Sequence, residues 1–463
     1  WTQLGADVFT PGAPGTPLWH NQAVQSLKVD PNNSRTVLTG TIHDLYVSHD
    51  GGTTWTRCPF GANPTDPTSA SNPVKSNNWI SSIVLDSGTS PTTAYVAVGD
   101  SSNYFNGVHR DGDNGVYKGT IPPNGCPSMS LVSTPGNGWP AGTGNGTNGG
   151  SSVGRIALAA SRGNATSQFT LYAQAADAAN NNALGTWVTR NGGTSWTELS
   201  GSADSNYKDC NGAPTPDAQD PYDLAFAVDP SNDRTLYVGR LDIYKGSVDS
   251  AYGSVTFSDL SNVASICPGG FTIHMDQHGF TWISGSGSTT QFLVGNDGGL
   301  YLGNGTAAGF TALNSSLAMS QVYDGQPGAG FASGGKQMLF AGSQDNGTND
   351  WSSASTTGLT WQSRIGSDGF FSAFDPIAGS ESTGNWYGER PQGVFFRSTA
   401  GATGLFQNLI VPWAADRLAW SAPFRLDTFH CTTSSCTNLV FASNHLYVSS
   451  DGANSWTRAG TPH

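Results

Sequence analysis

The sequence predicts an all-β fold, a single β-propeller domain of four-stranded antiparallel blades that covers residues 1–463. Three observations carry this prediction: short apolar stretches alternate with turns, one turn motif recurs three times, and a longer unit recurs along the chain. The 463 residues include 60 Gly and 25 Pro, and only 11% are charged. Such a composition is typical of many short strands joined by tight turns rather than of helices.

The turn motif occupies residues 48–55, 189–196 and 449–456. Each copy places Asp50, Asn191 or Asp451 before one or two glycines and ends on a tryptophan. The Asp or Asn side chain caps the turn, Gly supplies a positive φ, and Trp packs the turn onto the sheet. The motif resembles the Asp-box, or BNR, repeat of sialidases, xyloglucanases and sortilin-type propellers. This resemblance implies a propeller fold and gives the Asp-box residues a structural role.

Each motif ends a longer unit of three strand-like stretches, and the same order recurs where the motif is worn or missing. Units begin near Leu27, Ile80, Arg155, Leu224, Gly279, Val322, Phe371 and Phe424. We therefore predict eight blades, since repeats of this length match a propeller blade. Seven is the close alternative, if one unit is an insertion or if residues 1–9 supply the closing strand of the last blade.

The composition indicates where the protein is located and which classes of binding partner are disfavoured. No apolar stretch approaches the roughly 20 residues of a membrane helix, and the net charge of −13 disfavours nucleic acid. Six cysteines without a CxxC pair allow up to three disulfides, and Cys431 and Cys436 are close enough to staple a hairpin. We predict a secreted, extracellular monomer. Six N-glycosylation sequons agree with secretion and start at Asn32, Asn145, Asn164, Asn304, Asn314 and Asn346.

The register of the units predicts where a ligand binds. Segments that follow the second strand and segments that lead into the first strand meet at one end of the propeller axis, whereas the Asp-box turns lie at the other end. Polar residues recur at this axial end, as a ligand site requires. The catalytic candidates are His43, Asp44, Tyr222, His278, Tyr323 and Asp368. The substrate-binding candidates are Arg155, Arg240, Asn296, Gln344, Asp345, Glu389 and Arg390.

Residues 274–278, 295–299, 341–348 and 366–370 resemble segments of secreted Asp-box proteins from polysaccharide-degrading microbes. This resemblance covers about residues 270–400. The HxxxH spacing of His274 and His278 does not predict zinc, because side chains four apart share a face only on a helix. Residues 111–115 resemble part of a calcium loop without the terminal acidic ligand of an EF-hand. We predict no metal or cofactor at the site and leave a structural calcium open.

Two known activities of the Asp-box superfamily require particular residues. A sialidase would need an arginine triad, a Tyr–Glu nucleophile pair and an Arg-Ile-Pro motif, but the chain has three Glu and lacks that motif. Xyloglucanase-like inverting enzymes use two Asp across a cleft between two propellers. Here Asp44 and Asp368 could act as the base and the acid if their carboxyl groups lay ~6.5–9.5 Å apart.

A polysaccharide lyase is the first functional prediction, because cations recur among the candidate residues. β-Elimination next to a uronic acid such as glucuronate requires a clamp on the carboxylate, a base and an acid. Arg240 or Arg390 with Gln344 or Asn296 would be the clamp, His43 or His278 the base, and Tyr222 or Tyr323 the acid. A glycoside hydrolase with paired Asp is the second prediction. A non-catalytic carbohydrate- or protein-binding propeller is the third.

Overall fold

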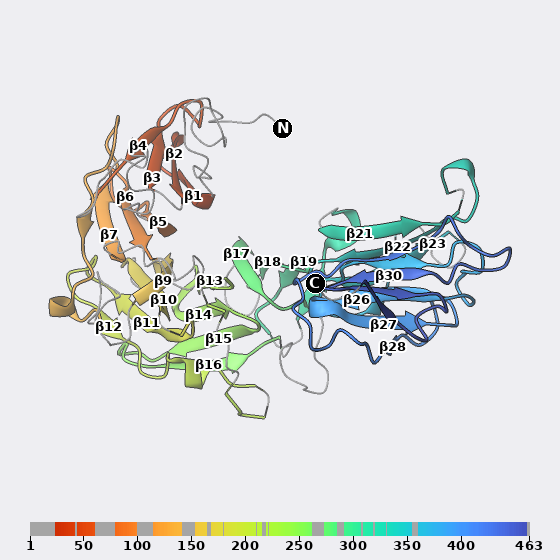
Figure 1. Ribbon diagram of the computed structural model, residues 1–463. Helices are drawn as coiled ribbons and strands as arrows, with labels where there is room; N and C mark the ends of the chain where they lie inside the picture. The colour runs from red at the N-terminus through yellow and green to blue at the C-terminus, as the bar shows by residue number, and fades with distance from the viewer. Residues whose placement is uncertain are drawn as a thin grey trace. The chain divides into compact units, whose positions relative to one another are not determined.

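A computed structural model contains two compact units, Trp1–Ser316 (unit 1) and Leu317–His463 (unit 2). The residues it describes are 24–41, 44–60, 79–99, 114–140, 153–163, 168–178, 180–209, 211–214, 219–220, 222–261, 273–284, 291–306, 309–317, 320–329, 331–353 and 360–460. Within these ranges the chain forms eight four-stranded antiparallel sheets, with strands hydrogen-bonded in chain order (Figure 1).

Unit 1 contains five of these sheets. The first is β1 Val24–Asp30, β2 Asn33–Thr41, β3 Leu45–Ser48 and β4 Thr56–Cys58; the second is β5 Ile80–Asp86, β6 Thr93–Val98, β7 Gly115–Thr120 and β8 Ser130–Leu131. The third is β9 Val153–Ser161, β10 Thr170–Asp177, β11 Ala183–Thr189 and β12 Thr197–Glu198; the fourth is β13 Ala225–Asp229, β14 Asn232–Gly239, β15 Ile243–Val248 and β16 Val255–Asp259. The fifth is β17 Gln277–Ser284, β18 Gln291–Asn296, β19 Gly299–Gly303 and β20 Phe310–Ala312.

Unit 2 contains the other three sheets. They are β21 Val322–Pro327, β22 Met338–Ser343, β23 Gly347–Ser352 and β24 Gln362–Ile365; β25 Ser372–Phe374, β26 Trp386–Arg390, β27 Val394–Ser398 and β28 Gln407–Asn408; and β29 Phe424–Leu426, β30 Leu439–Ala442, β31 Leu446–Ser449 and β32 Thr457–Ala459. Short 3-10 turns occur at η1 Pro135–Asn137, η2 Asp204–Asn206, η4 Asn314–Ser316, η5 Phe331–Ser333 and η6 Pro391–Gly393.

The all-β prediction and the predicted count of eight units are confirmed, and the sheets are consistent with the blades of an eight-bladed propeller. Every sheet begins within three residues of a predicted unit start. A repeated aspartate turn sets the first hairpin of several sheets. Asp30, Asp229 and Asp375 end or follow a first strand, and each accepts a hydrogen bond from the backbone N–H two residues later. This local Asx turn reverses the chain, so the hairpin is encoded in the sequence.

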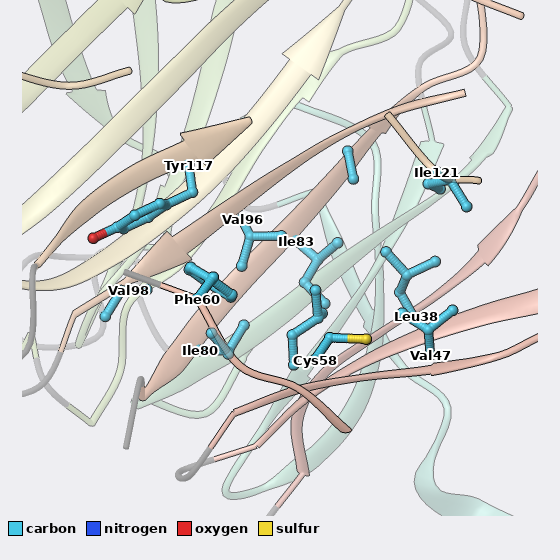
Figure 2. Close-up of a cluster of buried hydrophobic side chains, with 12 residues drawn as sticks. Leu38, Val47, Cys58, Phe60, Ile80, Ile83, Val96, Val98, Tyr117 and Ile121 are labelled. Atoms are coloured by element: carbon cyan, nitrogen blue, oxygen red, sulfur yellow. The ribbon is translucent and has the colours of Figure 1, made fainter. Parts of the chain in front are cut away.

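Neighbouring sheets within a unit bury apolar side chains between them. Figure 2 shows one such cluster, in which Leu38 and Val47 of the first sheet pack with Ile83 and Val96 of the second. In unit 2, Phe395, Trp413 and Phe441 form part of the corresponding cluster between the last two sheets. The apolar residues of each unit therefore form a series of clusters between neighbouring sheets, as expected where each repeat packs against the next.

The three Asp-boxes join the third and fourth strands of their sheets, as predicted. The carboxylate of Asp50 accepts hydrogen bonds from Ser48 Oγ, from the Thr54 N–H and from Thr54 Oγ1. These bonds, led by the one from the Thr54 side chain, lower the pKa of Asp50 to about 2. Asn191 repeats the acceptor bonds with its amide oxygen and donates from Nδ2 to Ser195. The motif therefore stabilises its own turn.

Two disulfides join described cysteines. Cys431–Cys436 closes the loop between β29 and β30, which confirms the predicted staple, and Cys58–Cys126 links β4 to the segment after β7. Cys210 and Cys267 lie outside the described residues. The disulfides indicate an oxidising environment. Within the described ranges, no helix is long and apolar enough to cross a membrane.

Candidate functional site

Unit 2 brings together four of the predicted site residues at one end of its sheets. Tyr323 lies at the start of β21, Gln344 and Asp345 follow β22, and Asp368 leads toward β25. The Tyr323 hydroxyl donates to Gln344 Oε1 at 3.2 Å, and the Asp345 backbone N–H donates to Asp368 Oδ1 at 3.0 Å. Loss of hydration, followed by the charges of Asp368 and Asp345, raises the pKa of Tyr323. Both carboxylates therefore lie close to this phenol.

Three aromatic rings lie in sequence beside these carboxylates. Phe370 is fully buried, and it contacts Tyr323 with ring centroids 4.7 Å apart and Trp420 with centroids 6.1 Å apart. Tyr323 is 41% exposed and Trp420 is 57% exposed. Exposed aromatic side chains held by a buried neighbour form a firm apolar surface next to polar groups, which is the usual composition of a ligand site. We call the set Tyr323, Gln344, Asp345, Asp368, Phe370 and Trp420 the aromatic–carboxylate cluster.

Arg390 lies beside the loop that carries Asp368. Its Nε donates to the Gly366 carbonyl at 2.7 Å, and its guanidinium lies over the Phe396 ring at 4.8 Å. These contacts use Nε and one face of the guanidinium. Among the described residues, no hydrogen-bond partner is present for the two terminal nitrogens of Arg390. Arg390 is thus anchored but can still donate to a ligand.

Glu389 is buried beneath the cluster rather than exposed in it. Its carboxyl accepts the Ala422 N–H at 2.9 Å, and its carbonyl accepts the Phe370 N–H at 3.2 Å. Burial raises the pKa of Glu389 to about 8, against the backbone hydrogen bonds from Ala422, Gly393 and Phe371, which lower it. Glu389 therefore connects the backbone of Phe370 to the segment that carries Trp420.

The backbone around this cluster contains unusual conformations. Asp345, Ser367 and Gln392 have φ of 57°, 72° and 59°. Each lies at or next to a residue of the site, since Ser367 precedes Asp368 and Gln392 donates its N–H to the Trp420 carbonyl. Left-handed non-glycine residues cost free energy and concentrate at functional sites. Their placement supports a ligand site here.

Unit 1 brings three other predicted residues together around Asp297. His278 Nε2 lies 2.5 Å from Asp297 Oδ1, and the Tyr222 hydroxyl donates to Asp297 Oδ2 at 3.0 Å. The His278 and Tyr222 rings pack edge to face with centroids 4.8 Å apart. Arg155 Nη1 donates to the Tyr222 carbonyl at 2.7 Å. We call Tyr222, His278 and Asp297 the histidine cluster.

The remaining predicted residues have internal partners. Asp44 is 2% exposed and accepts hydrogen bonds from Nε and Nη2 of Arg57 at 2.7 and 2.6 Å. Arg240 is 1% exposed and pairs with Asp220 at 2.7 Å and with Asp204 at 2.6 Å. Neither side chain faces solvent, so we do not place either in the proposed site. The Asn296 side chain donates to the His274 carbonyl and to Gln277 Oε1, and His43 lies outside the described residues.

Sequence reasoning left Asp297, Phe370 and Trp420 out of the candidate set. Asp297 and Phe370 stand next to the chosen Asn296 and close to Asp368, so the register pointed to their segments. Trp420 leads into the last unit, and a tryptophan at that register position was the signal available. In the described part of the chain, no group of three or more His, Cys, Asp and Glu side chains could hold a metal ion. The segment 111–115 with the calcium-loop pattern lies mostly outside that part.

Comparison of the folded chain with solved structures finds propellers. An ancestral GH74 enzyme is 14% identical, with a TM-score of 0.50 over 93% of this chain and 62% of that one. The fold is that of an Asp-box β-propeller. The GH74 xyloglucanase of Xanthomonas campestris is 15% identical, with a TM-score of 0.44 over 96% of this chain and 65% of that one. The YCF48 protein of Cyanidioschyzon merolae is 12% identical, with a TM-score of 0.37 over 81% and 94%.

These similarities concern the fold only. This chain spans less than two thirds of the length of either GH74 protein. No protein-family profile matches the sequence, and no curated protein matches it. The propeller fold is thus shared with glycoside hydrolases, while the chemistry must be argued from the side chains.

Proposed function

We propose that this protein is a secreted carbohydrate-active enzyme that hydrolyses a glycosidic bond at the aromatic–carboxylate cluster of unit 2. One observation carries the proposal: the exposed rings of Tyr323 and Trp420 flank buried Phe370 beside the carboxylates of Asp345 and Asp368. Aromatic faces bind the C–H faces of a sugar, and carboxyl groups exchange protons with glycosidic oxygen and water.

The two carboxyl groups supply both roles that hydrolysis needs. A carboxylic acid protonates the leaving oxygen, and a carboxylate activates water or attacks the anomeric carbon. We assign Asp368 as the carboxylate, because it accepts the Asp345 N–H and this bond orients it. Asp345 is then the acid. Gln344 and Arg390 are positioned to hydrogen-bond sugar hydroxyls from the same end of the sheets.

Elimination, the first prediction from the sequence, gains less support than hydrolysis. It rested on cations that would clamp a uronate, and the buried guanidinium of Arg240 is paired with two aspartates. Arg155 donates to the backbone carbonyl of Tyr222. An ancestral GH74 enzyme is among the solved structures that this chain resembles in fold.

The experiment incubates the protein with xyloglucan, with neutral β-glucans and with a uronate-rich gum. Xyloglucan is included because the turn motif resembles that of xyloglucanases. We expect new reducing ends without absorbance near ~235 nm, where the unsaturated product of elimination absorbs. Absorbance at this wavelength would establish elimination instead. Retained binding without either product would identify a binding propeller.

A further inference from the structure

The histidine cluster of unit 1 is assembled from separate sheets. Tyr222 leads into β13, His278 lies in β17, and Asp297 follows β18. Arg155 on β9 fixes the Tyr222 segment through the hydrogen bond to its carbonyl. The three side chains therefore come from two sheets, and Arg155 comes from a third. None of these contacts comes from neighbours in sequence. The proposed hydrolysis does not use any of them.

The contacts define where the imidazole proton resides. Both Asp297 oxygens accept hydrogen bonds, one from His278 Nε2 and one from the Tyr222 hydroxyl. A carboxylate in this position fixes the imidazole tautomer with its hydrogen on Nε2. In the described part of the chain, Nδ1 has no hydrogen-bond partner, and the side chain is 33% exposed. The ring thus presents a lone pair to solvent.

The groups around Nδ1 select the chemistry of a ligand. An acceptor nitrogen requires a ligand that donates, and the negative charge of Asp297 disfavours a carboxylate or a phosphate. Tyr222, which is 36% exposed and packs against the imidazole, adds an apolar face. A neutral sugar provides both hydroxyl donors and C–H faces.

We propose that Tyr222, His278 and Asp297 form a second carbohydrate-binding site, in unit 1, where His278 Nδ1 accepts a hydrogen bond from a neutral sugar hydroxyl. Asp297 is the positioning residue that fixes the imidazole, and Tyr222 packs against the sugar face. The inference rests on the proposed function only for the class of ligand.

Two substitutions of one residue separate binding from structure. In His278→Gln, the side-chain amide can reach the Nε2 position and still donate to Asp297, but the acceptor at Nδ1 is lost. In His278→Asn, the amide oxygen lies near the Nδ1 position and keeps an acceptor. Both are made in full-length protein that also carries Trp420→Ala, so that binding at unit 2 is weakened. Cellohexaose and a xyloglucan heptasaccharide are the probes, titrated by calorimetry.

We expect binding to remain in the Trp420→Ala protein, to fall about tenfold in His278→Gln and to fall much less in His278→Asn. A thermal unfolding scan and His278→Asn together separate lost binding from lost folding. Equal affinity in the Gln and Asn proteins, or no binding left in Trp420→Ala, would overturn the second site. Absence of hydrolysis with His278-dependent binding retained would instead refute the proposed function alone.

Discussion

The two clusters use similar positions in the repeat for different chemistry. Tyr222 and Tyr323 both stand where the chain leads into or begins the first strand of a sheet, and each hydroxyl donates to a residue that follows a second strand. In unit 1 that residue is Asp297 of the next sheet, which also holds His278. In unit 2 it is the amide Gln344 of the same sheet, and the carboxylates stand apart from the phenol's hydrogen bond.

The difference shows how one repeat position can carry two different sets of side-chain contacts. Where a carboxylate meets the tyrosine and a histidine, both carboxylate oxygens accept hydrogen bonds and an acceptor nitrogen of the imidazole remains. Where an amide meets the tyrosine, Asp345 and Asp368 are left to act beside exposed rings. The comparison predicts that catalysis depends on unit 2 and that unit 1 contributes binding.

The largest expected effect is that of Asp368→Asn. We expect kcat to fall by about 10²–10⁴, the range of general acid–base contributions, while binding of the oligosaccharide is retained. Reducing-end kinetics measure this. Asp451→Asn is the matched control, because it makes the same carboxyl-to-amide change in the same unit and Asn191 already occupies the equivalent Asp-box position. If Asp368→Asn kept full activity and His278→Gln lost it, the assignment of chemistry to unit 2 would be wrong.

Glu389→Gln probes the support of the unit 2 cluster. Because burial raises the pKa of Glu389 to about 8, from an ordinary 4.5, the folded chain binds a proton there more tightly than the unfolded chain. Stability from this group is complete below pH 4.5 and declines as the pH rises to about 8, by at most about 1.4 kcal/mol per pH unit.

Gln resembles the protonated acid, so the variant should match wild type near pH 5 and become the more stable protein near pH 9. Thermal unfolding across this range tests the expectation. Parallel pH profiles of the two proteins would show that Glu389 does not titrate in this window.

Trp420→Ala tests the aromatic surface. An aromatic contact contributes about 1 kcal/mol beyond its buried area, so we expect at least about fivefold weaker binding at unit 2, seen as a higher KM. Trp361→Ala is the matched control, since Trp361 is 42% exposed and directly precedes β24 outside the cluster. Equal losses in both variants would argue against a specific sugar platform.

The smallest effect is expected at the Asp-boxes. Hydrogen bonds, led by the one from the Ser455 side chain, lower the pKa of Asp451 to about 2, so its contribution is present above pH 3.8 and is lost as the pH falls toward 2. Asp451→Asn should leave neutral stability almost unchanged and reduce the acid dependence in that window. Acid unfolding followed by circular dichroism measures it. A large loss of stability at neutral pH would show that the Asp-boxes contribute more to the fold than local turn formation.

Local patterns made much of this molecule predictable. Turn residues at Asp30, Asp229 and Asp375 and the capping side chains of the three boxes act within a few residues of sequence. Their order therefore fixed the eight units and identified the end of the sheets where Tyr222, His278, Tyr323, Asp345 and Asp368 lie. Repeat register thus predicted positions well.

The side chains that pair with each candidate residue could not be predicted in this way, because they come from distant segments of the chain. Arg240 and Asp44 occupy the expected register, yet Asp204, Asp220 and Arg57 bury and neutralise them. Trp420 contacts Phe370 of the cluster, which lies 50 residues earlier in the sequence. The sequence by itself determined strands, turns and the end of the sheets at which the candidate residues lie, since these depend on local hydrogen bonds and periodicity. Only the tertiary structure decided which polar groups are buried in pairs and which remain exposed, since burial depends on how sheets pack.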